Sequence, residues 1–381
     1  MSSGLEDSAV FEDDGKNVLL FYPFVPDGAY EEVLDTLKSR WIGQGPKVDA
    51  LESDFSRRFL KDSSAVAVGS GTDALHLSYI LAGIKAGDEV ITPVFTCTAT
   101  NIPLLYCGAD IIFADIQPHS LNIDPNHVKE LITPKTKAIV CVDYGGYPAD
   151  LKELSEIAAL NGIPLIEDSA QSLGATYRGQ TVGNIADYTA FSFQAIKHIT
   201  TGDGGMLTFK NSSRLMEAKR RRWFGIDREG KQNGTWENDI WEIGYKYQMT
   251  DLGASLGLAS LREFDRIQKH RRILYEEYRA RLSFVPGIQL VGCNEEDRVS
   301  AAWIFTILAD NRIDLRRKLN ENKIEANQVH FRNDRYSIFN SFKGHFPCMD
   351  EVESRYLVLP LHHMVSLEDV DRICEIIKSG W

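Results

Sequence analysis

A lysine lies between two polar stretches in the middle of the chain. Residues 191–205 read FSFQAIKHITTGDGG, which places Lys197 between a Ser-Phe run and a turn rich in threonine and glycine. This arrangement suits a lysine held inside a pocket, where its amine can remain unprotonated and attack a carbonyl carbon. An exposed lysine beside a glycine turn is the alternative, so Lys197 needs neighbours that support a chemical role.

A second segment has the composition of a phosphate site. Gly69, Ser70, Gly71 and Thr72 follow the apolar run 65–68 and precede a helical pattern. Free backbone N–H groups and the positive end of a helix dipole bind phosphate at such a place. The segment is not a GxGxxG motif, because the third glycine is missing. It is not a P-loop either, because it has no lysine. It could also be an ordinary Gly-Ser-Gly turn.

A third segment supplies a carboxylate. Glu167 and Asp168 end an apolar run, and Gln171 follows closely. A carboxylate at the floor of a pocket can pair with a protonated ring nitrogen, although Asp is also a common helix N-cap. The three segments together fit pyridoxal 5′-phosphate (PLP). Lys197 would form a Schiff base, the carboxylate would pair with the pyridine nitrogen, and the helix end would hold the phosphate.

The elements around these segments alternate between strand and helix patterns. Short runs rich in β-branched residues are separated by amphipathic stretches, which predicts an α/β fold with a mostly parallel sheet covered by helices on both faces. Ligands bind at the carboxyl ends of the strands in such sheets, and all three segments lie at strand ends. The predicted strands are 65–68, 89–92, 110–114, 138–143, 164–167, 188–193 and 206–209, and the helices between them include 72–82, 99–107 and 151–161.

The chain of 381 residues is too long for one ordinary core. We expect a partly flexible N-terminal segment at 1–25, a large domain at 26–250, and a linking helix with a smaller α+β domain at 251–381. The linking helix is predicted at 252–282. Beyond it we predict strands at 287–291 and 301–308 and helices at 315–322 and 367–379.

The composition excludes several classes of function. A net charge of −12 argues against broad binding of nucleic acid or of an anionic membrane. The basic run KRRR at 219–222 is predicted to be a helix face or an interface. The six cysteines form no CxxC pair and the nine histidines show no ligand spacing, so we expect reduced thiols and no metal. No secretory signal or membrane-spanning stretch is recognised, which predicts a cytoplasmic protein.

The motifs resemble those of the DegT/DnrJ/EryC1/StrS family of PLP-dependent nucleotide-sugar aminotransferases. The likeness covers nearly the whole chain, and the segments that carry it are WIGQGPKVDALESDF, GSGTDALHL, GDEVITPVFTCTATNIPLLYCGA, IEDSAQSLGATYRG, SFQAIKHITTGDGG, GYKYQMTDLGASLGL and LPLHHMVSLEDVDRI. The resemblance implies the fold of aspartate aminotransferase (fold type I) and a homodimer with active sites at the subunit interface. It also implies transfer of an amino group, with L-glutamate as donor, to a keto-deoxy nucleotide sugar, the 4-keto position being favoured over the 3-keto position.

The resemblance also assigns roles to single residues. It implies that Lys197 is the Schiff-base lysine, that Asp168 pairs with the pyridine nitrogen and that Gln171 lies near the phenolic oxygen of the cofactor. Phosphate contacts are implied for Gly71, Thr72 and Ser192. Candidate contacts for the sugar or the nucleotide diphosphate are His330, Arg332 and the loop WFGIDR, which begins at Trp223.

Two cofactor positions depart from the family pattern. Cys97 stands where the family usually has an aromatic residue stacked on the ring, and a thiol offers much less contact area. Lys246 replaces an Asn that reaches the phosphate in the partner subunit, so an ammonium would meet that phosphate instead of an amide. The segment NQVHFRNDRYSIF also differs from the usual pattern, and it bears on sugar specificity.

Three other functions are alternatives to the aminotransferase. Some relatives carry histidine in place of the Schiff-base lysine and act as deoxysugar dehydratases; His198 is one position too late for that, so the lysine is retained. A non-catalytic regulatory relative would not need Lys197, Asp168 and Gln171 together. A nicotinamide dehydrogenase is a fourth possibility, but the chain lacks a dinucleotide fingerprint. We therefore favour the aminotransferase.

Overall fold

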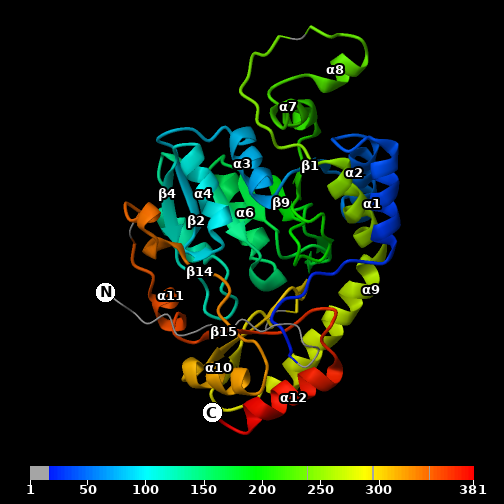
Figure 1. Ribbon diagram of the computed structural model, residues 1–381. Helices are drawn as coiled ribbons and strands as arrows, with labels where there is room; N and C mark the ends of the chain where they lie inside the picture. The colour runs from blue at the N-terminus through cyan, green and yellow to red at the C-terminus, as the bar shows by residue number, and fades with distance from the viewer. Residues whose placement is uncertain (1–16, 238, 294–295, 343) are drawn as a thin grey trace.

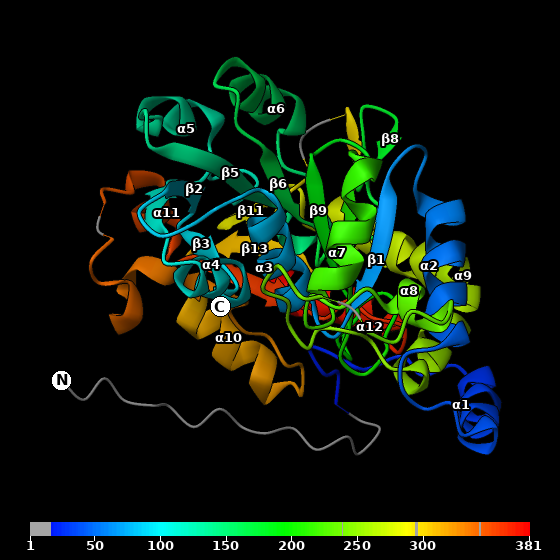
Figure 2. The ribbon, with the colours of Figure 1, turned by 90° about the horizontal axis from the view of Figure 1, so that it is seen from above.

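A seven-stranded sheet forms the centre of the computed structural model, which describes residues 17–237, 239–293, 296–342 and 344–381 (Figures 1 and 2). Only β10 runs antiparallel to its neighbours in this sheet, which is therefore mostly parallel, as predicted. The strand order is β1 (Ser64–Val68), β10 (Gly205–Phe209), β9 (Tyr188–Ser192), β6 (Leu165–Asp168), β5 (Thr136–Val142), β2 (Glu89–Pro93) and β4 (Asp110–Ala114).

Helices cover both faces of this sheet because its strands are apolar on both sides. Successive strand residues point to opposite faces, so Val66 joins the core under α3 (Gly71–Leu81) and α4 (Thr98–Tyr106). Ala67 joins the core under α2 (Pro46–Phe59), α6 (Leu151–Leu160) and the first half of α9 (Asp251–Leu282). The sheet is thereby buried between two helical layers.

A smaller antiparallel sheet follows α9 in the chain and lies below the large sheet in Figure 1. It consists of β11 (Ile288–Leu290), β13 (Phe305–Ala309) and β15 (Tyr356–Leu359), and it packs with α10 (Arg312–Glu321) and α12 (Leu367–Lys378). The 32-residue α9 places Leu258 in the core of the large sheet and Tyr278 in the core of the small one. One helix therefore fixes the two sheets relative to each other.

The remaining elements are short or peripheral. They are α1 (Gly28–Ser39), α5 (Pro125–Leu131), α7 (Leu215–Arg221), α8 (Arg228–Gln232), α11 (Pro347–Val352), β3 (Phe95–Thr96), β7 (Thr176–Tyr177), β8 (Gln180–Thr181), β12 (Arg298–Val299), β14 (Phe331–Arg332) and the 3₁₀ turns Tyr144–Gly146, Ser212–Arg214, Asn333–Arg335 and Ser337–Phe339. In the described part of the chain, no helix is both long enough and apolar enough to cross a membrane. The predicted flexibility of residues 1–16 falls outside the described residues.

One predicted strand was wrong at its start. Residues 301–308 were expected to be extended, but β13 begins only at Phe305. The residues before it do not pair with a strand: the backbone N–H groups of Ala301 and Trp303 donate to Gly146 and Gly145, in the 3₁₀ turn after β5. Apolar composition alone did not distinguish this segment from the strand that follows.

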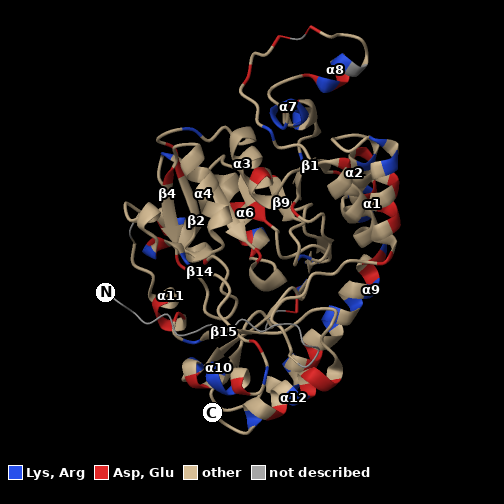
Figure 3. Ribbon diagram, in the orientation of Figure 1, with Lys and Arg blue, Asp and Glu red and all other residues tan. Residues whose placement is uncertain are grey.

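The basic run 219–222 lies on and just after α7, and its charges are neutralised by carboxylates (Figure 3). Its ion pairs are Lys219–Glu229, Arg220–Glu242, Arg221–Glu217 and Arg222–Glu52. The last pair joins the buried Arg222 to the partly exposed Glu52 and covers the edge of the sheet at Ala67. Glu52 accepts from the N–H of Ala67 at 2.8 Å, and Arg222 donates to the carbonyl of Ala67 at 2.8 Å. An edge strand with satisfied backbone groups does not offer a template to another chain.

We predict that Arg222→Ala lowers the free energy of unfolding by about 1–3 kcal/mol, because it leaves the largely buried Glu52 carboxylate and the carbonyl of Ala67 without the guanidinium that donates to both. The matched control is Arg57→Ala, which removes an exposed ion pair with Asp54 and should cost about 0–1 kcal/mol. Urea unfolding followed by circular dichroism measures both. Equal losses in the two variants would contradict a structural role for the Arg222–Glu52 pair.

Candidate active site

The lysine loop joins β9 to β10 and folds back on itself at the carboxyl edge of the sheet. Phe193 N–H donates to Gly204 at 2.8 Å, and Thr201 N–H donates to Phe193 at 2.9 Å, which closes the loop. A Cβ at Gly205 would lie 2.5 Å from the carbonyl oxygen of Ser70, so only glycine fits at this point. The glycine-rich turn therefore brings the loop against the end of β1.

The amine of Lys197 lies under an indole ring. Its Nζ is 3.8 Å from the centroid of Trp303, a residue of the segment that precedes β13. Burial lowers the pKa of Lys197 to about 8, an effect that the nearby charge of Asp168 opposes. A lysine with this pKa has a useful fraction of neutral, nucleophilic amine near neutral pH.

Asp168 is the last residue of β6 and is buried at the same edge. Its Oδ2 accepts from the hydroxyl of Thr100 at 2.7 Å and its Oδ1 from the N–H of Ala170 at 3.1 Å. Burial raises the pKa of Asp168, while the hydrogen bond from Thr100 and the charge of Lys197 act in the opposite direction. The structure thus brings a buried carboxyl group within electrostatic reach of Lys197.

Gln171 and His330 complete the surroundings of this edge. The Gln171 Oε1 accepts from the N–H of Gly145 at 2.7 Å, so its Nε2 is the donor to His330 Nε2 at 3.1 Å. His330 therefore carries its proton on Nδ1, and burial lowers its pKa to about 3. The pairing of β14 with β3 holds the segment that follows His330 against the large sheet, and the His330 ring stacks on Trp303 at 6.2 Å between centroids.

The start of α3 lies at the same edge of the sheet, against the end of β9. Ser70 caps the helix by accepting from the N–H of Asp73 at 3.0 Å. A Cβ at Gly71 would lie 2.9 Å from the Cβ of Ser192, so glycine allows β9 and the helix to meet here. The first N–H groups of a helix have no intrahelical acceptor, which leaves those of Gly71 and Thr72 for an anion.

Cys97 also belongs to this group, whereas Lys246 and Trp223 do not. Cys97 is the N-cap residue of α4; burial raises the pKa of its thiol, and it lies within electrostatic reach of both Asp168 and Lys197. Lys246 is exposed, forms a β-bridge with Trp223 and lies with its Nζ 5.2 Å from the Phe224 ring centroid. These residues belong to the chain between α7 and α9.

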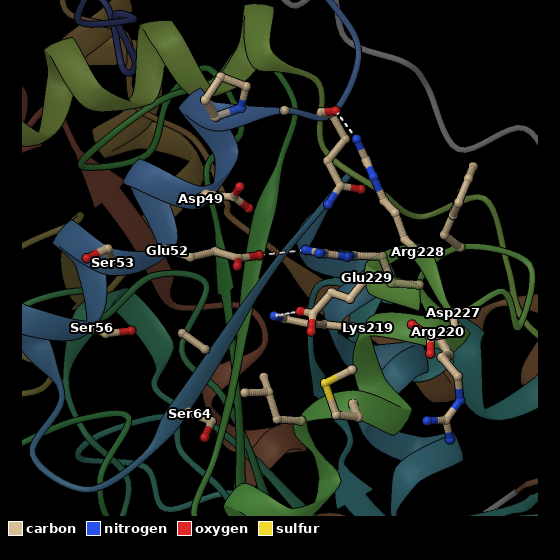
Figure 4. Close-up of a pocket in the computed structure, with 18 of the residues that line it drawn as sticks. Asp49, Glu52, Ser53, Ser56, Ser64, Lys219, Arg220, Asp227, Arg228 and Glu229 are labelled. Carbon is tan, nitrogen blue, oxygen red and sulfur yellow. Dashed lines mark hydrogen bonds and ion pairs between the residues drawn. The ribbon is translucent and has the colours of Figure 1, made fainter. Parts of the chain in front are cut away.

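Trp223 lines a separate cavity of about 760 Å³ between α2 and the α7–α8 region (Figure 4). Lys197 does not line it. Several charged groups of the cavity already have partners: Glu52 pairs with Arg222, Lys219 pairs with Glu229, and Arg228 donates to the carbonyl of Gln44. This cavity is therefore distinct from the group around Lys197.

Arg332 is buried among carboxylates. Its guanidinium forms ion pairs with Asp334 at 2.8 Å, with Glu353 at 3.1 Å and with Asp350. These contacts fix the segment that carries His330, two residues earlier. Contact of Arg332 with a substrate stays a prediction.

A pair of buried acids lies on the other face of β6. Asp143 accepts from the hydroxyls of Ser172 at 2.7 Å and Ser169 at 3.2 Å, which fixes the turn that carries Gln171. Glu167 accepts from Thr189 at 2.9 Å, and its other oxygen has no hydrogen-bond partner among the described residues. Burial and the proximity of Asp143 raise the pKa of Glu167. We infer that Glu167 holds a proton.

Three residues in or next to the site differ in how far they could be predicted from the sequence. Asp143 ends a predicted strand, so a carboxylate at the carboxyl edge was visible in the sequence. Thr100 lies in a threonine-rich segment without a chemical signature. Trp303 follows α9 in the chain, and no sequence pattern around it indicated a place in the site.

Comparisons with known proteins agree with this architecture. Residues 27–378 match the model of the DegT/DnrJ/EryC1/StrS aminotransferase family. The crystal structure of AtS13 from Actinomadura melliaura is 34% identical and superposes with a TM-score of 0.91, covering 96% of this chain and 99% of that one. The sugar aminotransferase CalS13 from Micromonospora echinospora is 30% identical with a TM-score of 0.91, covering 96% and 100%. A GDP-perosamine synthase from Vibrio cholerae is 32% identical over 91% of this chain and 94% of its own length.

These neighbours have the type I fold of PLP-dependent enzymes. The expected fold class, an α/β protein of fold type I with a mostly parallel sheet, is therefore confirmed.

We predict that Glu167→Gln alters the pH dependence of stability. The folded protein holds a proton on Glu167 that the unfolded chain releases above its ordinary pKa of 4.5, so this group destabilises the fold increasingly as the pH rises from that value through the raised pKa. Glutamine has the same shape and no charge, so the stability of the variant should gain on that of the wild type over this range. Thermal unfolding at several pH values measures the difference. A constant difference would show that Glu167 is not protonated in the fold.

Proposed function

The chain belongs to the DegT/DnrJ/EryC1/StrS aminotransferase family, and on this basis we propose that it is a PLP-dependent aminotransferase acting on a nucleotide sugar. The amino group would pass from an amino acid, L-glutamate, to a keto-deoxy nucleotide sugar, with the 4-keto position favoured over the 3-keto position. The observation that carries the proposal is the half-buried amine of Lys197, covered by the Trp303 ring, at the same sheet edge as the buried carboxyl group of Asp168. The similarity to CalS13 and to a GDP-perosamine synthase supports a nucleotide-sugar substrate.

The residues at this edge fit the cofactor. Gly71 lets the start of α3 approach Ser192 closely, and the free helix N–H groups beside the Ser192 hydroxyl suit a phosphate. Asp168 would pair with the pyridine nitrogen, Gln171 would lie near the phenolic oxygen, and Cys97 would lie against the ring. Lys197 would hold the aldehyde carbon. When bound, PLP supplies an electron-withdrawing ring that acidifies the Cα–H bond of an amino acid.

The protein's own contribution is to hold and move protons. The neutral amine of Lys197 would accept the proton from the donor Cα, because its lowered pKa keeps part of it unprotonated near neutral pH. Asp168 would keep the ring nitrogen protonated by pairing with it. Burial of Asp168 would strengthen this electrostatic pairing.

The proposal includes a homodimer in which each subunit contributes to the other's site. Lys246 is exposed, and the segment with α8 extends away from the body of the molecule (Figure 1), as expected of residues that reach a partner's phosphate. His330 and Trp223 are proposed to contact the sugar nucleotide. We further propose that the enzyme is cytoplasmic, with its cofactor domain at 26–250.

We predict that the purified protein shows the visible absorbance of a lysine-bound PLP and that Lys197→Ala abolishes both this band and amino transfer, because the amine that holds the cofactor and moves the proton is lost. Absorbance spectra and turnover with L-glutamate measure the two effects. The matched control is Lys210→Ala, which changes an exposed lysine just after β10 and should behave as the wild type. Full turnover in Lys197→Ala would overturn the proposal.

We also predict that a panel of 3-keto and 4-keto nucleotide sugars with L-glutamate yields an aminosugar, because Lys197 is available as the proton-transfer base. Mass spectrometry of the products distinguishes an aminosugar from a sugar that has only lost a hydroxyl group. A product that has lost a hydroxyl group without gaining nitrogen would establish the dehydratase instead.

A further inference from the structure

The segment 300–303, just before β13, is held by a row of side-chain donors. Arg272 Nε donates to the carbonyl of Ser300 at 3.2 Å, Gln268 Nε2 to Ala301 at 2.8 Å and Arg271 Nη1 to Trp303 at 3.0 Å. The three donors lie on one side of α9, since helical residues three and four apart share a face. This contact explains why the segment is not part of a strand.

The other side of the segment is bound to the large sheet. The N–H groups of Ala301 and Trp303 donate to the carbonyls of Gly146 at 2.8 Å and Gly145 at 3.2 Å. Gly146 has a φ of +90°, and a Cβ there would lie 3.1 Å from the nitrogen of Trp303. The segment is therefore fixed from both sides.

Both chain neighbours of Lys197 are hydrogen-bonded to the same segment. Trp303 Nε1 donates to the carbonyl of Ile196 at 3.2 Å, and His198 Nε2 donates to the carbonyl of Ala301 at 2.7 Å. The indole of Trp303 then covers the Lys197 Nζ at 3.8 Å. Residues before, at and after position 197 thus contact a segment that lies about a hundred positions further along the chain.

Arg271 is a buried cation whose contacts are backbone carbonyls. It is buried, and no salt bridge to it is found among the described residues; its Nε also lacks a hydrogen-bond partner there. A buried cation without a carboxylate is costly. Its donors go instead to the carbonyls of Trp303 and Leu361, at 3.0 and 2.8 Å, so it joins the segment to the chain after β15.

We propose that Trp303 is a positioning residue for Lys197: its indole covers the amine, and Arg271 and Gln268 on α9 hold the segment that presents it. The covering ring shields one side of the amine from water, and the hydrogen bonds at Ile196 and His198 fix the direction of the lysine. The proposal rests on the proposed role of Lys197 as the reactive amine. It adds a residue from outside the cofactor-binding motifs to the site.

The test is the titration of Lys197 in the full-length protein, freed of any bound aldehyde with hydroxylamine and dialysed. The rate of acetylation of Lys197 by acetic anhydride, followed by peptide mass spectrometry, is measured against pH. In the wild type the midpoint should lie near the lowered pKa of about 8. In Trp303→Leu it should rise by about one pH unit or more, because burial is the largest cause of the lowered pKa and water now reaches the amine.

Two further variants keep the test decisive. Trp303→Phe keeps an aromatic face but loses the indole N–H, and it should give a smaller upward shift; it serves as the test if the leucine variant does not fold. Phe284→Leu removes an aromatic ring that is 96% exposed just after α9 and should leave the midpoint unchanged. A midpoint equal to that of the wild type in both Trp303 variants would overturn the proposal. The measurement needs neither cofactor nor substrate, so it fails or succeeds independently of the proposed aminotransferase activity.

Discussion

The arrangement of this protein depends on keeping one amine away from water at an open sheet edge. The carboxyl ends of parallel strands face outwards, and a lysine there is normally solvated and charged. The glycine-rich loop alone cannot prevent this, since its glycines provide tight turns but no covering side chains. The cover comes from Trp303, which belongs to the segment before the second sheet. The site therefore exists only when the two sheets are correctly placed.

That placement is the task of α9. Its first half is packed in the core of the large sheet and its second half in that of the small one, so the helix cannot tilt without disturbing both. Between the two halves, Gln268 and Arg271 donate to the segment that carries Trp303. Because these polar contacts lie at the junction of two apolar cores, small displacements of either sheet are transmitted directly to the indole. The helix that links the sheets also shapes the site.

The parts of the fold that depend on local pattern were predictable from the sequence. The apolar runs of the large sheet and the lysine loop are contiguous, so their composition and spacing carried the information. Trp303 was not predictable, because its role depends on donors from α9 that only the tertiary structure brings together. The start of β13 was predicted too early for the same reason. Residues 301–304 are as apolar as a strand, but side chains of α9 donate to their backbone carbonyls in place of a neighbouring strand. Arg332 is the opposite case, because the sequence predicted a substrate contact for it as a cation near His330. The fold shows that carboxylates already neutralise this cation.

The two nucleophiles of the site illustrate how one environment can select between them. Cys97 and Lys197 are close enough for each to affect the other's ionisation, and both are half-buried. Burial disfavours the charged form of any group, so it raises the pKa of the thiol and lowers that of the amine. The reactive form of cysteine is the charged thiolate, whereas the reactive form of lysine is the neutral amine. The same exclusion of water therefore suppresses the thiol and activates the lysine, which allows a cysteine to occupy this position without competing for a carbonyl carbon.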